Sequence, residues 1–274
     1  MSFIFKITTT TSPQTFVIPC VHVGTFNATV DYGDGTGSQT VTAYNDSNLT
    51  HSFATAGQYT ITIDGTFPNI RFYDDAASRV LIDEVVDLGD VGWVALDRAF
   101  RDCTNLTTFN VGTADTSSVT TMQDMFLNCT SLTSLAVSNF DTSSVTTMES
   151  MFRNCTSLTN LDLSSFDTSS VNNLSFMFVT CRSLTTLNLN SFDTSSVTSM
   201  QAMFNSCSSL TALDLSSFDT SNITTMQGMF NVCSNLTALD IKHFDISSVT
   251  NGTNFLQNAN NALTTAAYDE LLEA

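Results

Sequence analysis

The chain has 274 residues, of which 42% are hydrophobic and 10% aromatic, as is typical of a globular protein with its own core. Its 26 acidic residues against 8 basic ones give a formal net charge of −18. Because phosphate backbones and anionic lipid surfaces repel such a chain, we expect no nucleic-acid partner. We also expect no membrane insertion and no signal peptide, since no apolar run reaches the required length.

The first 75 residues contain short runs that alternate apolar and polar side chains. The runs that predict strands are FIFKITT, QTFVIP, NATVDYG, SQTVTAY, QYTITIDG and NIRFY, separated by turn clusters such as GDGTG and TAGQ. This pattern predicts an all-β sandwich over residues 1–75, which we interpret as a mounting domain. No Gly/Ser-rich or Pro-rich linker follows it in the sequence, so we expect a rigid junction near residues 74–84.

Two segments of this region, VDYGDGTGSQTV at 30–41 and HSFATAGQYTITIDG at 51–65, carry a family pattern. The pattern runs W-x-F-G-D-G-T and then H-x-Y-x-x-x-G-x-Y-x-V. Tyr32 and Phe53 stand where it varies among aromatic residues. The positions that the chain keeps are Gly33, Asp34, Gly35, His51, Gly57 and Tyr59. The region therefore resembles the immunoglobulin-like domains of the polycystic-kidney-disease (PKD) type.

Six of the seven cysteines recur at an interval of 26 residues: Cys103, Cys129, Cys155, Cys181, Cys207 and Cys233. A constant interval without insertions is typical of a solenoid in which each repeat forms one coil. Disulfide frameworks have irregular spacing and zinc sites use close pairs of cysteines, so we predict reduced, buried side chains. Disulfides between coils are an alternative, because stacked coils bring Cα atoms to about 5 Å, and a metal site is a further one.

Each unit is predicted to begin with a short strand. In the unit that starts at Cys155, leucines follow an L-x-x-L-x-L spacing whose second half alternates, which places Leu161 and Leu163 on the inner face. Successive strands would then pair in parallel, and each repeated residue would form a ladder along the stack.

The second half of each unit is predicted to be a short helix. Its apolar residues have the i, i+3, i+6, i+7 spacing of a buried helical face, as in Val145, Met148, Met151 and Phe152. Threonine followed three residues later by Glu or Gln is typical of a capping box at a helix start. The threonines in question are Thr120, Thr146, Thr198 and Thr224.

The repeat consensus C-x-S-L-T-x-L-x-L-S-x-F-D-T-S-S-V-T-x-M-x-x-M-F resembles the BspA-type leucine-rich-repeat surface proteins over about residues 80–274. The resemblance implies a leucine-rich-repeat fold. It also implies a cell-surface or virion-associated module for adhesion and recognition, without enzymatic activity. Exported members would carry a signal peptide, and its absence favours a virion component of a phage.

The expected fold is therefore an immunoglobulin-like or PKD-like sandwich followed by an α/β leucine-rich-repeat solenoid over residues 76–274. The solenoid would consist of a degenerate coil at 77–102, six 26-residue repeats at 103–258 and a C-terminal cap at 259–274. The segment NALTTAAYDELLEA predicts that this cap is helical.

An aspartate opens the DTSS motif of every unit: Asp115, Asp141, Asp167, Asp193, Asp219 and Asp245. An aspartate before three hydroxyl residues is suited to close an Asx turn on the amides that follow, which predicts the corner of each coil. The alternative is a calcium ladder. Calcium needs six to eight oxygens, whereas each turn offers one acid, so we expect turn formation and no cofactor.

The candidate binding surface is the outward face of the predicted strands, with Asn110, Asp162, Asn188, Asp214 and Asp240. This face varies between units and is polar, as are the binding faces of many repeat proteins. The regular threonine row beside it suggests ice binding as an alternative. No nucleophile stands at a motif distance from His22, His51 or His243, so we predict no catalytic residue and no metal ligand.

The predicted function is a non-enzymatic, surface-displayed recognition or structural module. Its partner would be a protein or glycan on a cell surface, or another virion protein of a phage fibre, spike or head decoration. A bacterial cell-surface adhesin is the first alternative, and a hydrolase acting on glycans is the second. The sequence does not fix the oligomeric state.

Overall fold

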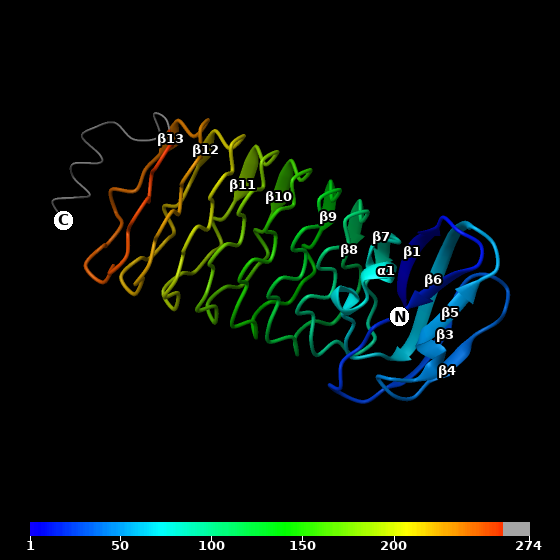
Figure 1. The fold of residues 1–274 in the computed structure, drawn as a ribbon. Coiled ribbons are helices and arrows are strands. Elements are labelled where there is room, and N and C mark those ends of the chain that lie inside the picture. The colour runs from blue at the N-terminus through cyan, green and yellow to red at the C-terminus, as the bar shows by residue number, and fades with distance from the viewer. Residues whose placement is uncertain (260–274) are drawn as a thin grey trace.

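The computed structural model describes residues 1–259, which form an elongated molecule with a strand-rich body at the N-terminal end and stacked coils beyond it (Figure 1). The body contains β1 (Phe3–Thr9), β2 (Gln14–Val17), β3 (Asn27–Asp31), β4 (Gln39–Val41), β5 (Thr50–Phe53) and β6 (Gly57–Thr66). Two 3₁₀ turns, Ser47–Leu49 and Phe72–Asp74, and the short helix α1 (Ala76–Arg79) complete it.

Alternating side chains build the core of the N-terminal body. Every second residue of β1 is buried, so Phe3, Phe5 and Ile7 face inward while the residues between them are half-buried. The ring centroid of Phe5 lies 6.2 Å from that of Phe16 on β2, which belongs to a separate two-stranded sheet with β5. Side chains of the two sheets therefore meet in this core, and the alternation in the sequence marks the inward-facing residues of β1.

One mixed sheet joins this body to the repeats. Its strand order is β4-β3-β6-β1-β7-β8-β9, where β7 is Ile82–Asp87, β8 is Thr108–Asn110 and β9 is Ser134–Ala136. The pairings are antiparallel as far as β7 and parallel from β7 to β9. The sheet thus continues across residue 75, where we predicted the boundary between two domains, and that division stays a prediction.

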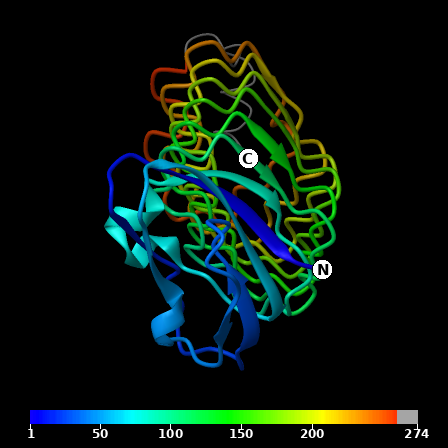
Figure 2. The same cartoon turned by 90° about the vertical axis from the view of Figure 1, so that its right-hand side faces the viewer.

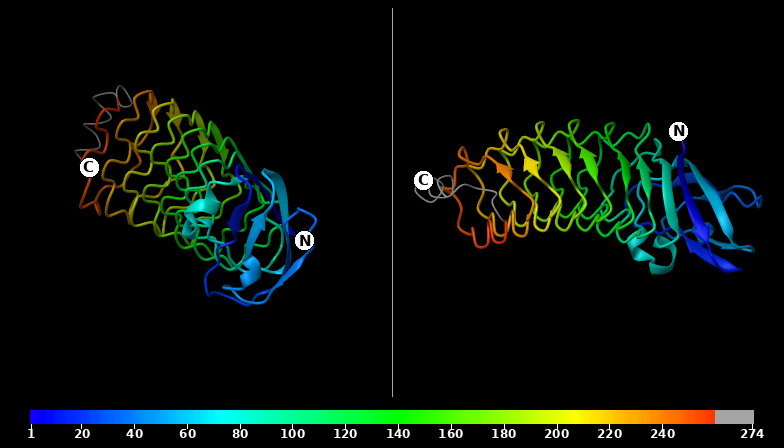
Figure 3. Two further views of the ribbon diagram at one scale, coloured as in Figure 1. Left: turned by 45° about the vertical axis from the view of Figure 1, so that its right-hand side comes forward. Right: turned by 90° about the horizontal axis from the view of Figure 1, so that it is seen from above.

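Strands of neighbouring units pair in parallel at an interval of 26 residues, in three separate pairs. The first pair is β8 and β9, the second is β10 (Asn160–Asp162) and β11 (Thr186–Asn188), and the third is β12 (Ala212–Leu213) and β13 (Ala238–Leu239). Leu161 pairs with Leu187, and Leu213 pairs with Leu239. Isolated parallel bridges such as Thr121 to Thr147 continue the same register on a second side of each coil. Figure 3 shows the short strands side by side along the molecule.

The predicted helix in each unit does not form. In its place, alternate backbone amides donate to the next coil, as Asp124 N does to Glu149 O at 2.9 Å and Phe126 N to Met151 O at 2.9 Å. The amides between them close local turns, as Met125 N does on Met122 O at 3.2 Å. Half of the amides are therefore unavailable for helical hydrogen bonds, because they link the coils.

Left-handed residues enforce this alternation. Each unit has two positions with positive φ, and in one unit they are Ser150 at 56° and Asn154 at 62°. A left-handed residue reverses the direction of its amide and ends any right-handed helix. The threonines predicted to cap helices instead link neighbouring coils, as Thr146 Oγ1 does by donating to Thr120 O at 3.2 Å.

The predicted fold class, a sandwich followed by an α/β leucine-rich-repeat solenoid, is therefore wrong. The described part of the chain is nearly all-β, and its one α-helix, α1, lies outside the repeats. A seven-stranded mixed sheet and three two-stranded sheets account for its strands. We also predicted a helical cap over residues 259–274. From residue 260 onward this segment lies outside the residues that the structure describes.

Ladders of identical side chains fill the coils. Six phenylalanines stack with ring centroids 5.5 to 5.9 Å apart and planes within 11° of one another: Phe100, Phe126, Phe152, Phe178, Phe204 and Phe230. The predicted apolar stripe of Val145, Met148, Met151 and Phe152 is fully buried, although on turns and not on a helix. Seen along the molecule in Figure 2, the coils overlay one another behind the N-terminal strands.

Candidate functional site

The five residues predicted for binding lie in one exposed row at the ends of the short strands. Asn110, Asp162 and Asn188 are the last residues of β8, β10 and β11, and Asp214 and Asp240 directly follow β12 and β13. Asp162 pairs with Asn188 in the ladder, which places the two side by side on adjacent coils.

A shallow groove of about 560 Å³ crosses this row in the middle of the stack. Strands β9, β10 and β11 line it, together with Thr133 before β9 and Thr159 before β10. Asp162 and Asn188 belong to the lining, whereas Asn110, Asp214 and Asp240 lie outside it. The structure thus brings two of the five predicted residues into one concavity and distributes the other three along the same edge.

Each of these five side chains closes an Asx turn. Asp162 Oδ1 accepts from Ser164 N at 3.0 Å, and Asn188 Oδ1 accepts from Asn190 N at 3.1 Å. The same bond forms at Asn110, Asp214 and Asp240. Hydrogen bonds from the backbone and side chain of the serine two residues on lower the pKa of Asp162, so this carboxylate is ionised at neutral pH. Its Oδ1 shapes the turn, and the residue belongs to the lining of the groove.

Asn160 and Thr186 lie on the same predicted outward strand face, although the five predicted binding residues do not include them. Thr186 Oγ1 donates to Asn160 Oδ1 at 2.7 Å, within the same groove. Both residues lie two positions before Asp162 or Asn188 on their strands, and a strand places such residues on the same face. Period-two alternation in the sequence thus predicts the face on which these two residues lie.

The threonine row at the groove edge is structural. Thr133 Oγ1 donates to Thr107 O at 3.2 Å, and Thr185 Oγ1 donates to Thr159 O at 3.1 Å. Because these hydroxyl protons are used to link coils, the row is not a free array of donors for ordered water.

The aspartate ladder forms the corners of the coils, as predicted. Each of the six aspartates accepts from the amide of the serine two residues on, at 2.8 to 3.1 Å. Hydrogen bonds from the serine hydroxyl and amide lower the pKa of Asp167, Asp193 and Asp219. Within residues 1–259, no three His, Cys, Asp or Glu side chains gather where they could hold a metal ion.

The threonine after each of these aspartates joins one coil to the next. Thr142 is buried, and its Oγ1 donates to Asp167 O and accepts from Asp167 N, both at 2.8 Å. Equivalent bonds from Thr116, Thr168, Thr194 and Thr220 continue along the stack. In the motif DTSS, the aspartate therefore closes the turn at the corner of a coil, and the threonine joins that coil to the next one. These groups are thus used within the protein.

The repeat cysteines are buried and unpaired. Their thiols donate to a backbone carbonyl of the preceding coil, as Cys155 Sγ does to Phe126 O at 3.2 Å. Burial raises the pKa of these thiols, and that of Cys181 reaches about 12. A thiol in this setting is protonated and inert, which is the state expected of a small core side chain.

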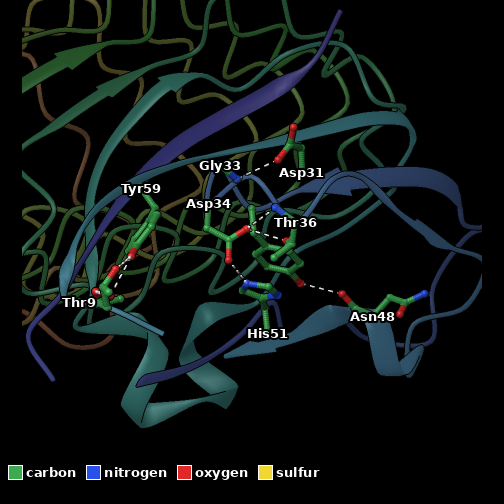
Figure 4. Close-up of polar contacts among 10 residues, drawn as sticks. Thr9, Asp31, Gly33, Asp34, Thr36, Asn48, His51 and Tyr59 are labelled. Carbon is green, nitrogen blue, oxygen red and sulfur yellow. Dashed lines mark hydrogen bonds and ion pairs between the residues drawn. The ribbon is translucent and has the colours of Figure 1, made fainter. Parts of the chain in front are cut away.

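A polar cluster in the N-terminal body surrounds His51, as Figure 4 shows. His51 Nε2 lies 2.7 Å from Asp34 Oδ2, and its ring stacks on Tyr32 with centroids 4.2 Å apart. Partial burial opposes ionisation of Asp34, but hydrogen bonds from Thr36 and His51 lower its pKa to about 2. The Thr36 hydroxyl donates to Asp34 and not to the imidazole, so these groups do not form a nucleophile, base and acid in that order.

Arginines cluster where the coils begin, and each lies beside an aspartate. Arg71 Nη2 is 2.6 Å from Asp97 Oδ2, and Arg101 Nη1 is 2.8 Å from Asp124 Oδ2. The Arg101 guanidinium also lies 4.3 Å from the centroid of the Tyr73 ring. The cluster is locally neutralised, and it joins the N-terminal body to the first coils.

The fold and this surface together define a repeat protein in which 26-residue units stack in register behind an N-terminal β-structure. A family model described as "Mycoplasma protein of unknown function, DUF285" matches residues 94–192 and again residues 180–266. Since these matches span more than half of the chain, the protein belongs to this family, which is related to the BspA-like surface repeat proteins. No curated protein and no solved structure matches the chain. Among residues 1–259, no helix has the length and apolar character that a membrane span requires.

Proposed function

We propose that the protein is a surface-displayed recognition module without catalytic activity. The N-terminal body, for which we keep the PKD-type assignment as part of the proposal, mounts the stack. The exposed strand face then contacts a protein or glycan on a cell surface. The observation that carries the proposal is the polar groove over β9 to β11, in a family related to surface repeat proteins.

The chemistry of the groove supports binding by many weak polar contacts. Strands β10 and β11 each present two hydrogen-bonding side chains to the groove, Asn160 with Asp162 and Thr186 with Asn188, and β9 adds Ser134. Their positions are fixed by the ladder and the Asx turns, so little side-chain entropy is lost on binding. An extended partner with polar groups at regular spacing would meet polar contacts on the neighbouring coils that line the groove.

The protonation state of the acids supports recognition over hydrolysis. A glycosidase needs one carboxyl group with a raised pKa to act as general acid. In Asp162 and Asp214, backbone and side-chain hydrogen bonds lower the pKa, and both side chains are exposed. Neither acid would hold a proton for a leaving group at neutral pH.

The proposal takes the surface of a cell as the setting, because the family is related to surface repeat proteins. Antibody labelling of the cells that produce the protein tests this setting. We expect intact and lysed cells to label alike, and brief protease treatment of intact cells to remove the signal. Labelling that needs lysis would refute surface display, and labelling confined to released particles would restore the phage-component alternative.

Binding through the groove is tested with fluorescent purified protein on intact cells. The double variant Asp162→Lys with Asn188→Lys should weaken cell binding at least tenfold, since it changes charge and shape in the groove. Asn110→Lys is the matched control, because Asn110 closes the same turn outside the groove. Equal loss in both variants would mean that the turns matter and the groove does not.

A further inference from the structure

A second concavity, of about 350 Å³, lies on the N-terminal body. One wall is the segment that leads into β3 and includes His22, Thr25 and Phe26. The other wall is the segment that follows β4 and includes Thr42 and Tyr44. None of these residues belongs to the strand-face groove, so the two sites are separate.

The first wall is held by a buried asparagine. Asn69 is 1% exposed, accepts from Val21 N at 2.8 Å, and donates to Val21 O at 3.2 Å and Val23 O at 2.8 Å. Gly24 has a φ of +73°, and a Cβ there would lie 2.7 Å from Pro68 Cβ. The loop therefore packs where only glycine fits, in a fixed conformation.

An aspartate holds the second wall. Asp46 Oδ2 accepts from Thr42 N at 3.0 Å, and Asp46 Oδ1 accepts from Asn48 N at 3.0 Å. Its own amide donates to Ala43 O at 3.2 Å, which closes the turn that carries Tyr44. Both walls are thus preformed, so a ligand would not have to order them.

The lining combines aromatic rings with hydroxyl groups. Tyr44 is 38% exposed, and its ring meets that of His22 at 82° with centroids 4.9 Å apart. Phe26 is nearly buried and packs edge to face on Phe67 at 5.3 Å. Thr25 and Thr42 are both exposed at the rim. Aromatic faces attract the slightly positive hydrogens of C–H groups, and hydroxyls both donate and accept hydrogen bonds.

We propose that this pocket binds a single neutral pyranose ring of a glycan. A pyranose has an apolar C–H face for the aromatic rings and a rim of hydroxyls for Thr25 and Thr42. The volume is at the low end for small-molecule pockets, which suits one ring. The net charge of −18 disfavours acidic sugars and other anions. A proline-rich peptide fits less well, because it needs several aromatic grooves in succession.

Saturation-transfer difference NMR tests the proposal on the full chain. The probes are the methyl glycosides of glucose, galactose, mannose and N-acetylglucosamine, each at millimolar concentration. We expect transfer to the ring protons of at least one glycoside. Tyr44→Ala should weaken its binding about tenfold, because the main aromatic contact is lost. Tyr44→Phe should bind nearly as wild type, since the ring is kept.

Asn45→Ala is the matched control, because Asn45 is the exposed neighbour of Tyr44 and does not line the pocket. Circular dichroism and a melting curve for each variant establish that it folds. Absence of transfer to all four glycosides would overturn the proposal, as would transfer that Tyr44→Ala leaves unchanged. So would Tyr44-dependent binding of a proline-rich peptide by a protein that binds none of the glycosides. The groove and this pocket share no residue, so none of these results decides whether the groove binds a cell surface. The cell-labelling and cell-binding experiments test that function.

Discussion

The residue before each repeat cysteine has a left-handed backbone, and in one unit it is a valine. Val232 has a φ of 59°, close to the 62° of Asn154 at the equivalent position. A left-handed conformation costs an ordinary residue about 1–2 kcal/mol, and a β-branched one is worse placed still, whereas asparagine tolerates it. Val232 is 37% exposed, so an asparagine there sacrifices little apolar burial. We therefore expect Val232→Asn to stabilise the protein by about 1 kcal/mol.

Urea unfolding followed by circular dichroism measures this effect, together with a rise in melting temperature of about 2–4 °C. Asn154→Val is the reverse change and should destabilise by a similar or larger amount. It also removes the hydrogen bond from Asn154 Nδ2 to Asn128 Oδ1 at 2.9 Å. A neutral or destabilising Val232→Asn in a correctly folded protein would show that the left-handed backbone is not strained there.

Two further predictions concern the coil links and the N-terminal cluster. Thr142→Val should cost about 1–3 kcal/mol in urea unfolding, because it removes a buried hydroxyl whose partners are the partly buried amide and carbonyl groups of Asp167. The exposed Ser144→Ala should change stability by less than about 0.5 kcal/mol. Equal effects of the two would contradict the link. Asp34 has a folded pKa of about 2, below its ordinary value, so its stabilisation is present above about pH 4 and is lost as pH falls toward 2. The difference in unfolding free energy between wild type and Asp34→Asn should be about 1–2 kcal/mol at neutral pH and shrink over that window. A pH-independent difference would argue against a stabilising Asp34 carboxylate.

The sequence predicted the register of the repeats and their buried ladders, but not the backbone between strands. The spacing of Val145, Met148, Met151 and Phe152 suits one face of a helix and equally a series of tight turns whose apolar side chains point inward. What distinguishes the two is the left-handed backbone, and the first of its two positions in each unit carries no constant residue. It is occupied by Asp124, Ser150, Phe176, Ala202 and Gly228 in successive units. Only the glycine signals such a backbone, and it occurs once.

Of the two candidate sites, the groove could be predicted in part from the sequence, and the pocket could not. Exposure of Asp162 and Asn188 followed from strand alternation, and their Asx turns could have been inferred by the rule that correctly predicted the turn at Asp141. The pocket at Tyr44 could not be predicted from the sequence. Its two walls are irregular loops that the β3–β4 pairing and the side chain of Asn69 bring together, and neither loop has a periodic pattern.

The stacked phenylalanines have one more consequence, which concerns how such proteins change length over generations. Each coil offers its neighbours the same ring, the same threonine link and the same register. A gene that lost or gained one whole 26-residue unit would therefore still encode a chain in which every coil finds a matching neighbour. Each such event would shorten or lengthen the molecule by about 4.8 Å, the spacing of paired strands. The reach of the far end from the N-terminal pocket could thus be adjusted in small, tolerated steps, without redesign of the fold.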